Sequence, residues 1–172
     1  MRSVRVVLIG MMGSGKSSVG RALSRRTGWP FVDNDSLVER ASGMTARQLL
    51  EERGAAAMRG AESAALHAGI AIEPPVVVAT AAGTILDAAN RAALADAGLV
   101  VWLRASARTL AARAVGAAHR PWLEDDPVGW FERTLLERDP LYAAVADLEI
   151  DTAALSPERA ADAILARVSA GG

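Results

Sequence analysis

The sequence predicts an α/β fold in which a five-stranded parallel sheet lies between two layers of helices. Short apolar runs rich in valine, leucine and isoleucine alternate along the chain with longer stretches of helical periodicity. A glycine-rich turn follows the first apolar run directly, as in a strand–turn–helix unit. The length of 172 residues suits one compact domain. We therefore expect a single domain over residues 1–172.

The predicted strands are short, apolar and bounded by glycine, proline or polar residues. Residues 76–80 form a near-continuous apolar run, as expected for a central strand covered on both faces. The strands are expected at Val4–Ile9, Pro30–Asp33, Val76–Thr80, Leu99–Leu103 and Leu148–Asp151.

The predicted helices fill the segments between these strands. Ser156 and Pro157 give the last of them an N-cap and an N1 proline. The helices are expected at Lys16–Thr27, Ser36–Ser42, Thr45–Arg53, Ala55–Ala71, Asp87–Ala97, Ser106–Ala118, Val128–Arg138 and Pro157–Ala170.

Composition excludes several classes of protein. The absence of cysteine excludes a disulfide scaffold, a cysteine-ligated metal site and thiol catalysis. A net charge of -1 and a pI near 6.1 disfavour a nucleic-acid-binding protein. No apolar run reaches the roughly 18 residues of a membrane span. We expect a cytoplasmic monomer that binds a small-molecule substrate and neither nucleic acid nor membrane.

Residues 10–17, GMMGSGKS, match the phosphate-binding pattern G-x-x-x-x-G-K-[ST]. Glycines let successive backbone N–H groups point at phosphate oxygens, and the following helix adds its positive end. Lys16, the only lysine of the chain, should reach the β- and γ-phosphates, and the Ser17 hydroxyl should bind Mg²⁺. The ATP-binding residues expected here are Gly13, Ser14, Gly15, Lys16, Ser17 and Ser18.

The motif alone does not separate kinases from GTPases and ATPase motors. A GTPase needs a second lysine in its base-reading N/T-K-x-D motif, and this chain has none. The chain is also short for a motor. The sequence therefore favours a small-molecule kinase.

The second predicted strand ends in Asp33-Asn34-Asp35, which carries two carboxylates. Ligands of open α/β sheets bind beyond the carboxyl ends of the strands, so Asp33 and Asp35 should face the phosphate loop. Strand alternation would place both on one side, with Asp33 near Mg²⁺ and Asp35 near a substrate hydroxyl. No aspartate ends the predicted strand at residues 76–80, which strengthens Asp33 as the metal partner. The alternative is that Asp35 only caps the next helix.

Three arginines are further candidates, although each could be a solvated surface group. Arg59 precedes Glu62 by three residues and could pair with it on a helix. Arg120 lies in a segment, residues 115–127, that could be a mobile lid bringing an arginine to the transferred phosphate. Arg138 precedes Asp-Pro-Leu-Tyr.

Taken in order, these landmarks resemble the shikimate kinase family from about residue 4 to residue 170. The resemblance rests on GMMGSGKSSVGRAL at 10–23, FVDND at 31–35, Arg59-x-x-Glu62, VVVATAAG at 76–83, HRPWLE at 119–124, RDPLYAAVADLEIDT at 138–152 and Ser156-Pro157. It implies a nucleoside-monophosphate-kinase-like fold and ATP-dependent conversion of shikimate to shikimate 3-phosphate, a step of aromatic amino acid biosynthesis.

The resemblance also implies a role for each matching residue. Arg59 and Arg138 would hold a carboxylate, and Asp35 would bind ring hydroxyls and help deprotonate the attacking one. Arg120 would contact ATP phosphates from the lid. Gly83 would bind the substrate, and Asp33 would be linked to Mg²⁺ through a water molecule. Arg113 and Pro157 would contact the adenine from its two sides.

The chain departs from the family pattern in two places, both on the acceptor side. Residues 81–83 are Ala-Ala-Gly where the family shows three glycines, and residues 54–59 are GAAAMR where it shows Gly-Glu-Glu-x-Phe-Arg. An alanine at a position that needs positive φ would cost about 1 kcal/mol. Two alternatives therefore stay open: a kinase of another hydroxylated ring or sugar acid, and a non-catalytic nucleotide-binding protein.

Overall fold

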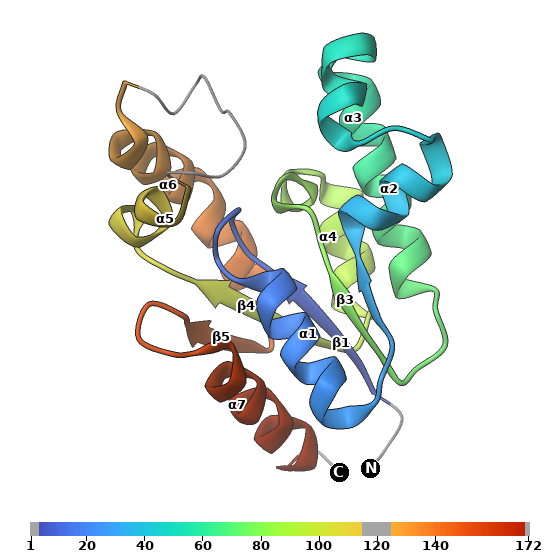
Figure 1. The fold of residues 1–172 in the computed structure, drawn as a ribbon, viewed down its shortest axis with the longest axis vertical. Helices are drawn as coiled ribbons and strands as arrows, with labels where there is room; N and C mark the ends of the chain where they lie inside the picture. Colours follow the sequence, from blue (N-terminus) through green and yellow to red (C-terminus); the bar gives the residue numbers. More distant parts are fainter. Residues whose placement is uncertain (1–3, 115–124, 171–172) are drawn as a thin grey trace.

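The computed structural model describes residues 4–114 and 125–170 of the chain (Figure 1). A five-stranded sheet in the order β2-β3-β1-β4-β5 pairs all its neighbouring strands in parallel. This confirms the predicted fold class. The strands are β1 (Arg5–Ile9), β2 (Phe31–Asp33), β3 (Val76–Ala79), β4 (Leu99–Arg104) and β5 (Leu148–Asp151).

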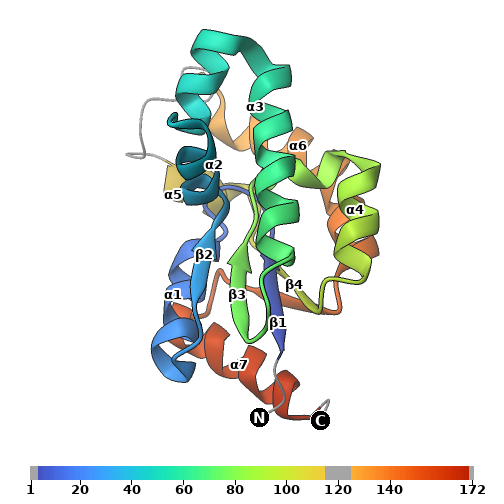
Figure 2. The ribbon, with the colours of Figure 1, turned by 90° about the vertical axis from the view of Figure 1, so that its right-hand side faces the viewer.

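Helices cover both faces of the sheet (Figure 2). Alternation along β1 separates two cores, because Val6 and Leu8 face one side while Val7 and Ile9 face the other. One face packs on α1 and α7, and the opposite face on α3, α4, α5, α6 and the 3₁₀ helix η1. The helices are α1 (Lys16–Thr27), α2 (Asn34–Ser42), α3 (Ala46–Ile70), η1 (Ala82–Leu86), α4 (Ala88–Ala95), α5 (Ala107–Ala114), α6 (Pro127–Val145) and α7 (Pro157–Ala170).

Several helix boundaries differ from the sequence prediction, among them those of α2, α3 and α6. Helix α3 contains both helices predicted between residues 45 and 71, with a non-helical Gly54 (φ 86°, ψ 173°) at the predicted break. Helix α2 begins two residues early because the Asp33 carboxylate caps it, accepting the N–H of Asp35. Helix α6 does not end at Arg138 but passes through Pro140 to Val145.

The described helices frame the carboxyl ends of the strands. Figure 1 shows α5 and α6 rising on one side of the loop after β1, and α2 and α3 on the other. No helix among the described residues is long and apolar enough to cross a membrane. The predicted lid, residues 115–127, lies mostly outside the described residues; its last residues, Asp126 and Pro127, cap and begin α6.

Candidate active site

The glycine-rich loop joins β1 to α1 at the carboxyl edge of the sheet. Gly13 and Gly15 have φ angles of 78° and 99°, which residues with a Cβ rarely adopt. At Gly10 a Cβ would lie 2.3 Å from the carbonyl oxygen of Leu103 on β4. Within the described chain no side chain caps α1, so its first N–H groups are available to an anion.

Lys16 bends back over this loop. Its Nζ donates hydrogen bonds to the carbonyl oxygens of Gly10 and Met11, at 2.7 and 2.9 Å. Burial lowers the pKa of Lys16 to about 8, although the negative charges of Asp33 and Asp35 oppose that shift. The ammonium is therefore poorly solvated before any phosphate arrives, and a bound polyphosphate would stabilise its charged form.

This pKa predicts a pH dependence of ATP binding. Below pH 8 the free protein already carries the Lys16 proton, whereas above it binding must take up that proton. We expect ATP affinity to be nearly constant from pH 7 to 8 and then to fall by up to about tenfold per pH unit. Calorimetry at pH 7 and pH 9, each in two buffers of different ionisation enthalpy, measures both effects. Equal affinity at the two pH values without proton uptake would contradict this assignment.

Ser17 and Asp33 form a pair of oxygen ligands beside Lys16. The Ser17 hydroxyl donates to Asp33 Oδ2 at 2.5 Å, while Asp33 Oδ1 accepts the backbone N–H of Asp35 at 3.2 Å. A serine oxygen and one carboxylate suit Mg²⁺, which usually completes its shell with waters and nucleotide phosphates. The described residues hold no group of three or more acidic or histidine side chains that could bind a metal by themselves.

Asp35 lines the cavity, but the element that places it there is not the one predicted. Strand alternation does not place it, because β2 ends at Asp33 and Asp35 belongs to the first turn of α2. The alternative that Asp35 caps this helix is wrong, since the capping side chain is that of Asp33. Asp33 and Asp35 nevertheless line the same cavity.

Arg59 is held at the other end of this cavity by two neighbours. Its Nη1 donates to Glu62 Oε2 at 2.8 Å, and this glutamate side chain is only 9% exposed. The guanidinium lies against Gly83, where a Cβ would be 1.6 Å from the same nitrogen. A side chain at position 83 would therefore force this guanidinium to move.

The two alanines before Gly83 do not strain the backbone. Ala81 has φ −71° and ψ 142°, and no non-glycine residue of the described chain has a positive φ. The conformational cost considered for alanine at positions 81 and 82 therefore does not arise. Both residues line the cavity.

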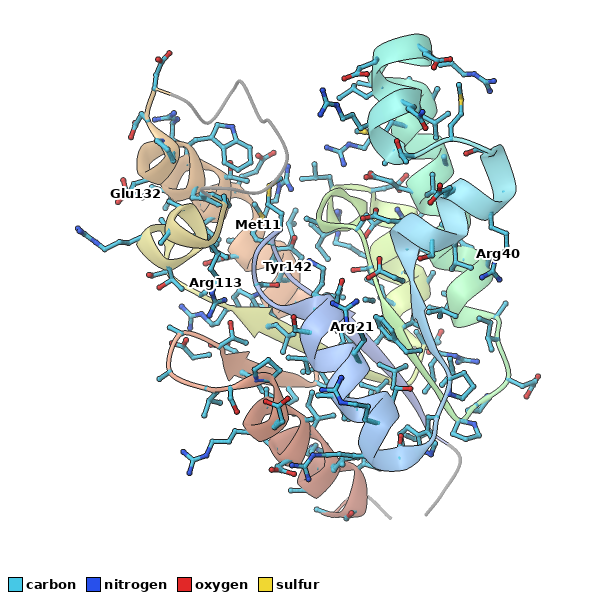
Figure 3. All side chains as sticks on the ribbon, in the orientation of Figure 1. Met11, Arg21, Arg40, Arg113, Glu132 and Tyr142 are labelled. Atoms are coloured by element: carbon cyan, nitrogen blue, oxygen red, sulfur yellow. The ribbon has the colours of Figure 1, made fainter. Side chains whose placement is uncertain are left out.

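Arg113 extends from α5 toward the end of β5 (Figure 3). Its Nη1 donates to the carbonyl oxygen of Gly13 at 3.0 Å, and its Nη2 to that of Thr152 at 2.7 Å. The Thr152 hydroxyl in turn donates to the carbonyl oxygen of Ser14 at 2.9 Å. Two side chains distant in sequence thus brace the phosphate loop.

One cavity of about 1210 Å³ brings the predicted residues together. Arg120 lies outside the described residues. All the other predicted site residues line the cavity: Gly13, Ser14, Gly15, Lys16, Ser17, Ser18, Asp33, Asp35, Arg59, Gly83, Arg113, Arg138 and Pro157.

Sequence reasoning missed several residues of this site. Thr152 directly follows β5, and its polar character at the carboxyl end of a strand was an available signal. Trp130, Met58 and Leu155 also line the cavity, but an apolar side chain gives no comparable signal.

Known proteins match this chain over most of its length. A sequence model of the family described as shikimate kinase matches residues 12–169. The shikimate kinase of Symbiobacterium thermophilum is 41% identical over 152 residues, covering 87% of this chain and 87% of that protein. The shikimate kinase of Chromobacterium violaceum is 40% identical over 146 residues, covering 84% and 79%.

This chain also resembles solved kinase structures over nearly its whole length. The shikimate kinase from Acinetobacter baumannii, in complex with shikimate, superposes with a TM-score of 0.91 at 32% identity, covering 99% of this chain and 95% of that one. A gluconokinase from Sinorhizobium meliloti superposes less closely, with a TM-score of 0.61 at 26% identity, covering 98% and 95%.

Proposed function

Because this chain belongs to the shikimate kinase family, we propose that it transfers the γ-phosphoryl group of ATP to the 3-hydroxyl of shikimate. The observation that carries the proposal is the shared cavity, which holds the phosphate loop together with Asp35, Arg59 and Arg138. A nucleotide phosphate and a small hydroxy acid can therefore meet without leaving the site. Phosphoryl transfer depends mainly on such positioning and on charge neutralisation.

On the ATP side, we assign the β- and γ-phosphates to Lys16 and the N–H groups of residues 13–18. Ser17 and Asp33 would hold the Mg²⁺ that neutralises phosphate charge. The adenine would lie between Arg113 and Pro157. Their shared place in the cavity supports this assignment.

On the acceptor side, we assign the shikimate carboxylate to Arg59 and Arg138, since a guanidinium pairs with a carboxylate through two parallel hydrogen bonds. Asp35 would accept a hydrogen bond from the attacking hydroxyl and take its proton. Gly83 would contribute its backbone N–H. The Arg59–Glu62 pair supports this part of the proposal, because it holds one guanidinium at the cavity wall.

Arg120 and the lid over residues 115–127 remain proposals from the family resemblance. In this role Arg120 would contact the transferred phosphate, and closure of the segment would exclude water. A cytoplasmic location and a monomeric state are likewise proposed. Light scattering during size-exclusion chromatography tests the monomer directly.

The test of the proposed function is ADP release from ATP·Mg²⁺ with and without shikimate, with the product identified by mass. We expect strong stimulation and a shikimate phosphate. Without stimulation, but with ATP binding confirmed, another hydroxy acid would become the leading acceptor. Failure of a panel of such acids would leave a nucleotide-binding protein without transferase activity.

Replacing Arg138 by lysine should weaken acceptor use much more than ATP binding. Lysine keeps the charge but cannot form the planar two-bond contact with a carboxylate. We expect KM for shikimate to rise about tenfold or more, with ATP affinity changed less than about twofold. Arg133→Lys is the matched control, because Arg133 is exposed on the same helix and pairs only loosely with Asp126 at 3.7 Å. Equal losses for both ligands in Arg138→Lys would contradict the assignment.

A further inference from the structure

Tyr142 is a buried residue on the cavity-facing side of α6. Only 1% of its surface is exposed. Its ring stacks on Trp102 of β4, with centroids 5.8 Å apart and an interplanar angle of 26°. It follows Arg138 by four residues, so both side chains leave the same face of the helix. Figure 3 shows Tyr142 close to Met11, at the start of the phosphate loop.

The Tyr142 hydroxyl points at the loop that precedes Gly83. It donates to the carbonyl oxygen of Ala82 at 2.8 Å. Met11 Sδ is 3.9 Å from the hydroxyl oxygen, but sulfur is the weaker acceptor, so the single proton belongs to the Ala82 bond. Burial raises the pKa of Tyr142, so the hydroxyl stays a donor throughout the neutral range.

The hydrogen bond from Tyr142 stabilises the backbone at Ala82 from outside its own segment. Ala82 begins η1, a short 3₁₀ helix whose hydrogen bonds to its two cap residues are long: Thr84 N to Ala81 O is 3.2 Å, and Asp87 N to Thr84 O is 3.4 Å. The Ala82 carbonyl and the Gly83 N–H belong to one planar peptide group. The hydroxyl therefore orients that N–H as well.

Arg59 rests against Gly83. Its Nη1 occupies the space that a Cβ of Gly83 would take, so the guanidinium packs directly on the backbone of this residue, and a shift of the Gly83 backbone would move the surface that supports it. The short described hydrogen bonds that brace the phosphate loop come instead from Lys16, Arg113 and Thr152, whereas Tyr142 and Arg138 reach that loop at the Met11 sulfur, at 3.9 and 3.8 Å. The stronger hydrogen bonds that orient the acceptor side and the ATP side are therefore different.

We propose that Tyr142 is a positioning residue of the acceptor site, whose hydroxyl orients the Ala82–Gly83 peptide and, through it, Arg59. The inference rests on the proposed function, and it deepens it by assigning acceptor affinity to an uncharged residue whose hydroxyl bonds the backbone beside Gly83. Arg138 also lies close enough to this hydroxyl to oppose the rise of its pKa. Loss of the hydroxyl should therefore separate acceptor use from ATP use.

Tyr142→Phe tests this directly, because the ring can still stack on Trp102. We expect KM for shikimate to rise about tenfold while KM for ATP changes less than about twofold. The matched control is Thr134→Val, which removes another buried hydroxyl from α6. Among residues 4–114 and 125–170, that hydroxyl bonds only within its own helix, to the Trp130 carbonyl at 2.8 Å. The control should change both KM values by less than about twofold.

Hydrogen exchange at residues 82–87 provides a readout that needs no turnover. Exchange there should be faster in Tyr142→Phe than in the wild type, and unchanged in Thr134→Val. Unchanged exchange in Tyr142→Phe, or equal rises of both its KM values, would overturn the inference. If the wild type does not phosphorylate shikimate, the proposed function fails, and exchange alone then decides whether Tyr142 holds this peptide.

Discussion

Replacing Lys16 by methionine is expected to lower the rate of phosphoryl transfer at least about a thousandfold. Methionine matches the length and apolar character of the lysine stem but carries no charge for the phosphates. No other lysine exists in the chain to substitute for it. A steady-state assay with ATP·Mg²⁺ and shikimate measures the loss.

The same variant should remain folded. Burial already lowers the pKa of Lys16, which means that holding the ammonium in this loop costs free energy that methionine avoids. The lost hydrogen bonds to Gly10 and Met11 act in the opposite direction, so we expect little change in Tm. Arg21→Met removes a positive charge from an exposed position of the same helix and is the matched control. A Lys16→Met enzyme within tenfold of the control's rate would refute the assigned role.

Replacing Gly83 by alanine is expected to lower kcat/KM for shikimate about a hundredfold and to leave ATP affinity unchanged. The new methyl group would occupy the position of Arg59 Nη1, 1.6 Å away, so the guanidinium must move. Arg59 is 44% exposed and can rotate outward. The cost therefore falls on acceptor binding and on the Glu62 ion pair more than on the fold.

Gly60→Ala provides the comparison for this variant. It makes the same chemical change one residue from Arg59, where a Cβ would meet nothing within 4 Å. Because alanine favours a helix interior over glycine, Gly60→Ala should keep or raise Tm. If Gly83→Ala uses shikimate as well as Gly60→Ala does, the close contact between Gly83 and Arg59 does not shape the acceptor site.

Local signals predicted the helix ends where a cap was visible in the sequence. Helix α1 begins at Lys16 and ends at Thr27 as predicted, because Gly28 adopts the left-handed conformation typical of a helix end. Helix α7 begins at Pro157 as predicted, and the Ser156 hydroxyl accepts the N–H of Arg159. These features depend on residues only a few positions apart.

The end of α6 was not predictable by the same rules. A proline normally ends a helix, because it removes one hydrogen bond and crowds the preceding turn. Here the helix continues past Pro140, and the next turn buries Tyr142 against Trp102. The gain from packing a large aromatic residue outweighs the local cost of proline.

In the candidate site, too, features set by local sequence were predictable and features set by tertiary packing were not. The phosphate-loop motif and Asp33 were predictable, because the motif directly follows β1, Asp33 is the last residue of β2, and the topology brings strand ends together. The contacts from Thr152 to Ser14 and from Tyr142 to Ala82 join residues 138 and 60 positions apart. Such pairs depend on tertiary packing, which no local pattern in one sequence encodes.

The fixed position of Lys16 over the phosphate loop has a consequence for proteolysis. A protease that cleaves after lysine can cut this chain at one bond only, between Lys16 and Ser17, and that bond lies where the phosphate loop enters α1. Cleavage requires this segment to open, because the Lys16 amine is held by two backbone carbonyls. The rate at which two defined fragments form therefore reports local opening of the loop, and ATP should slow it in proportion to site occupancy.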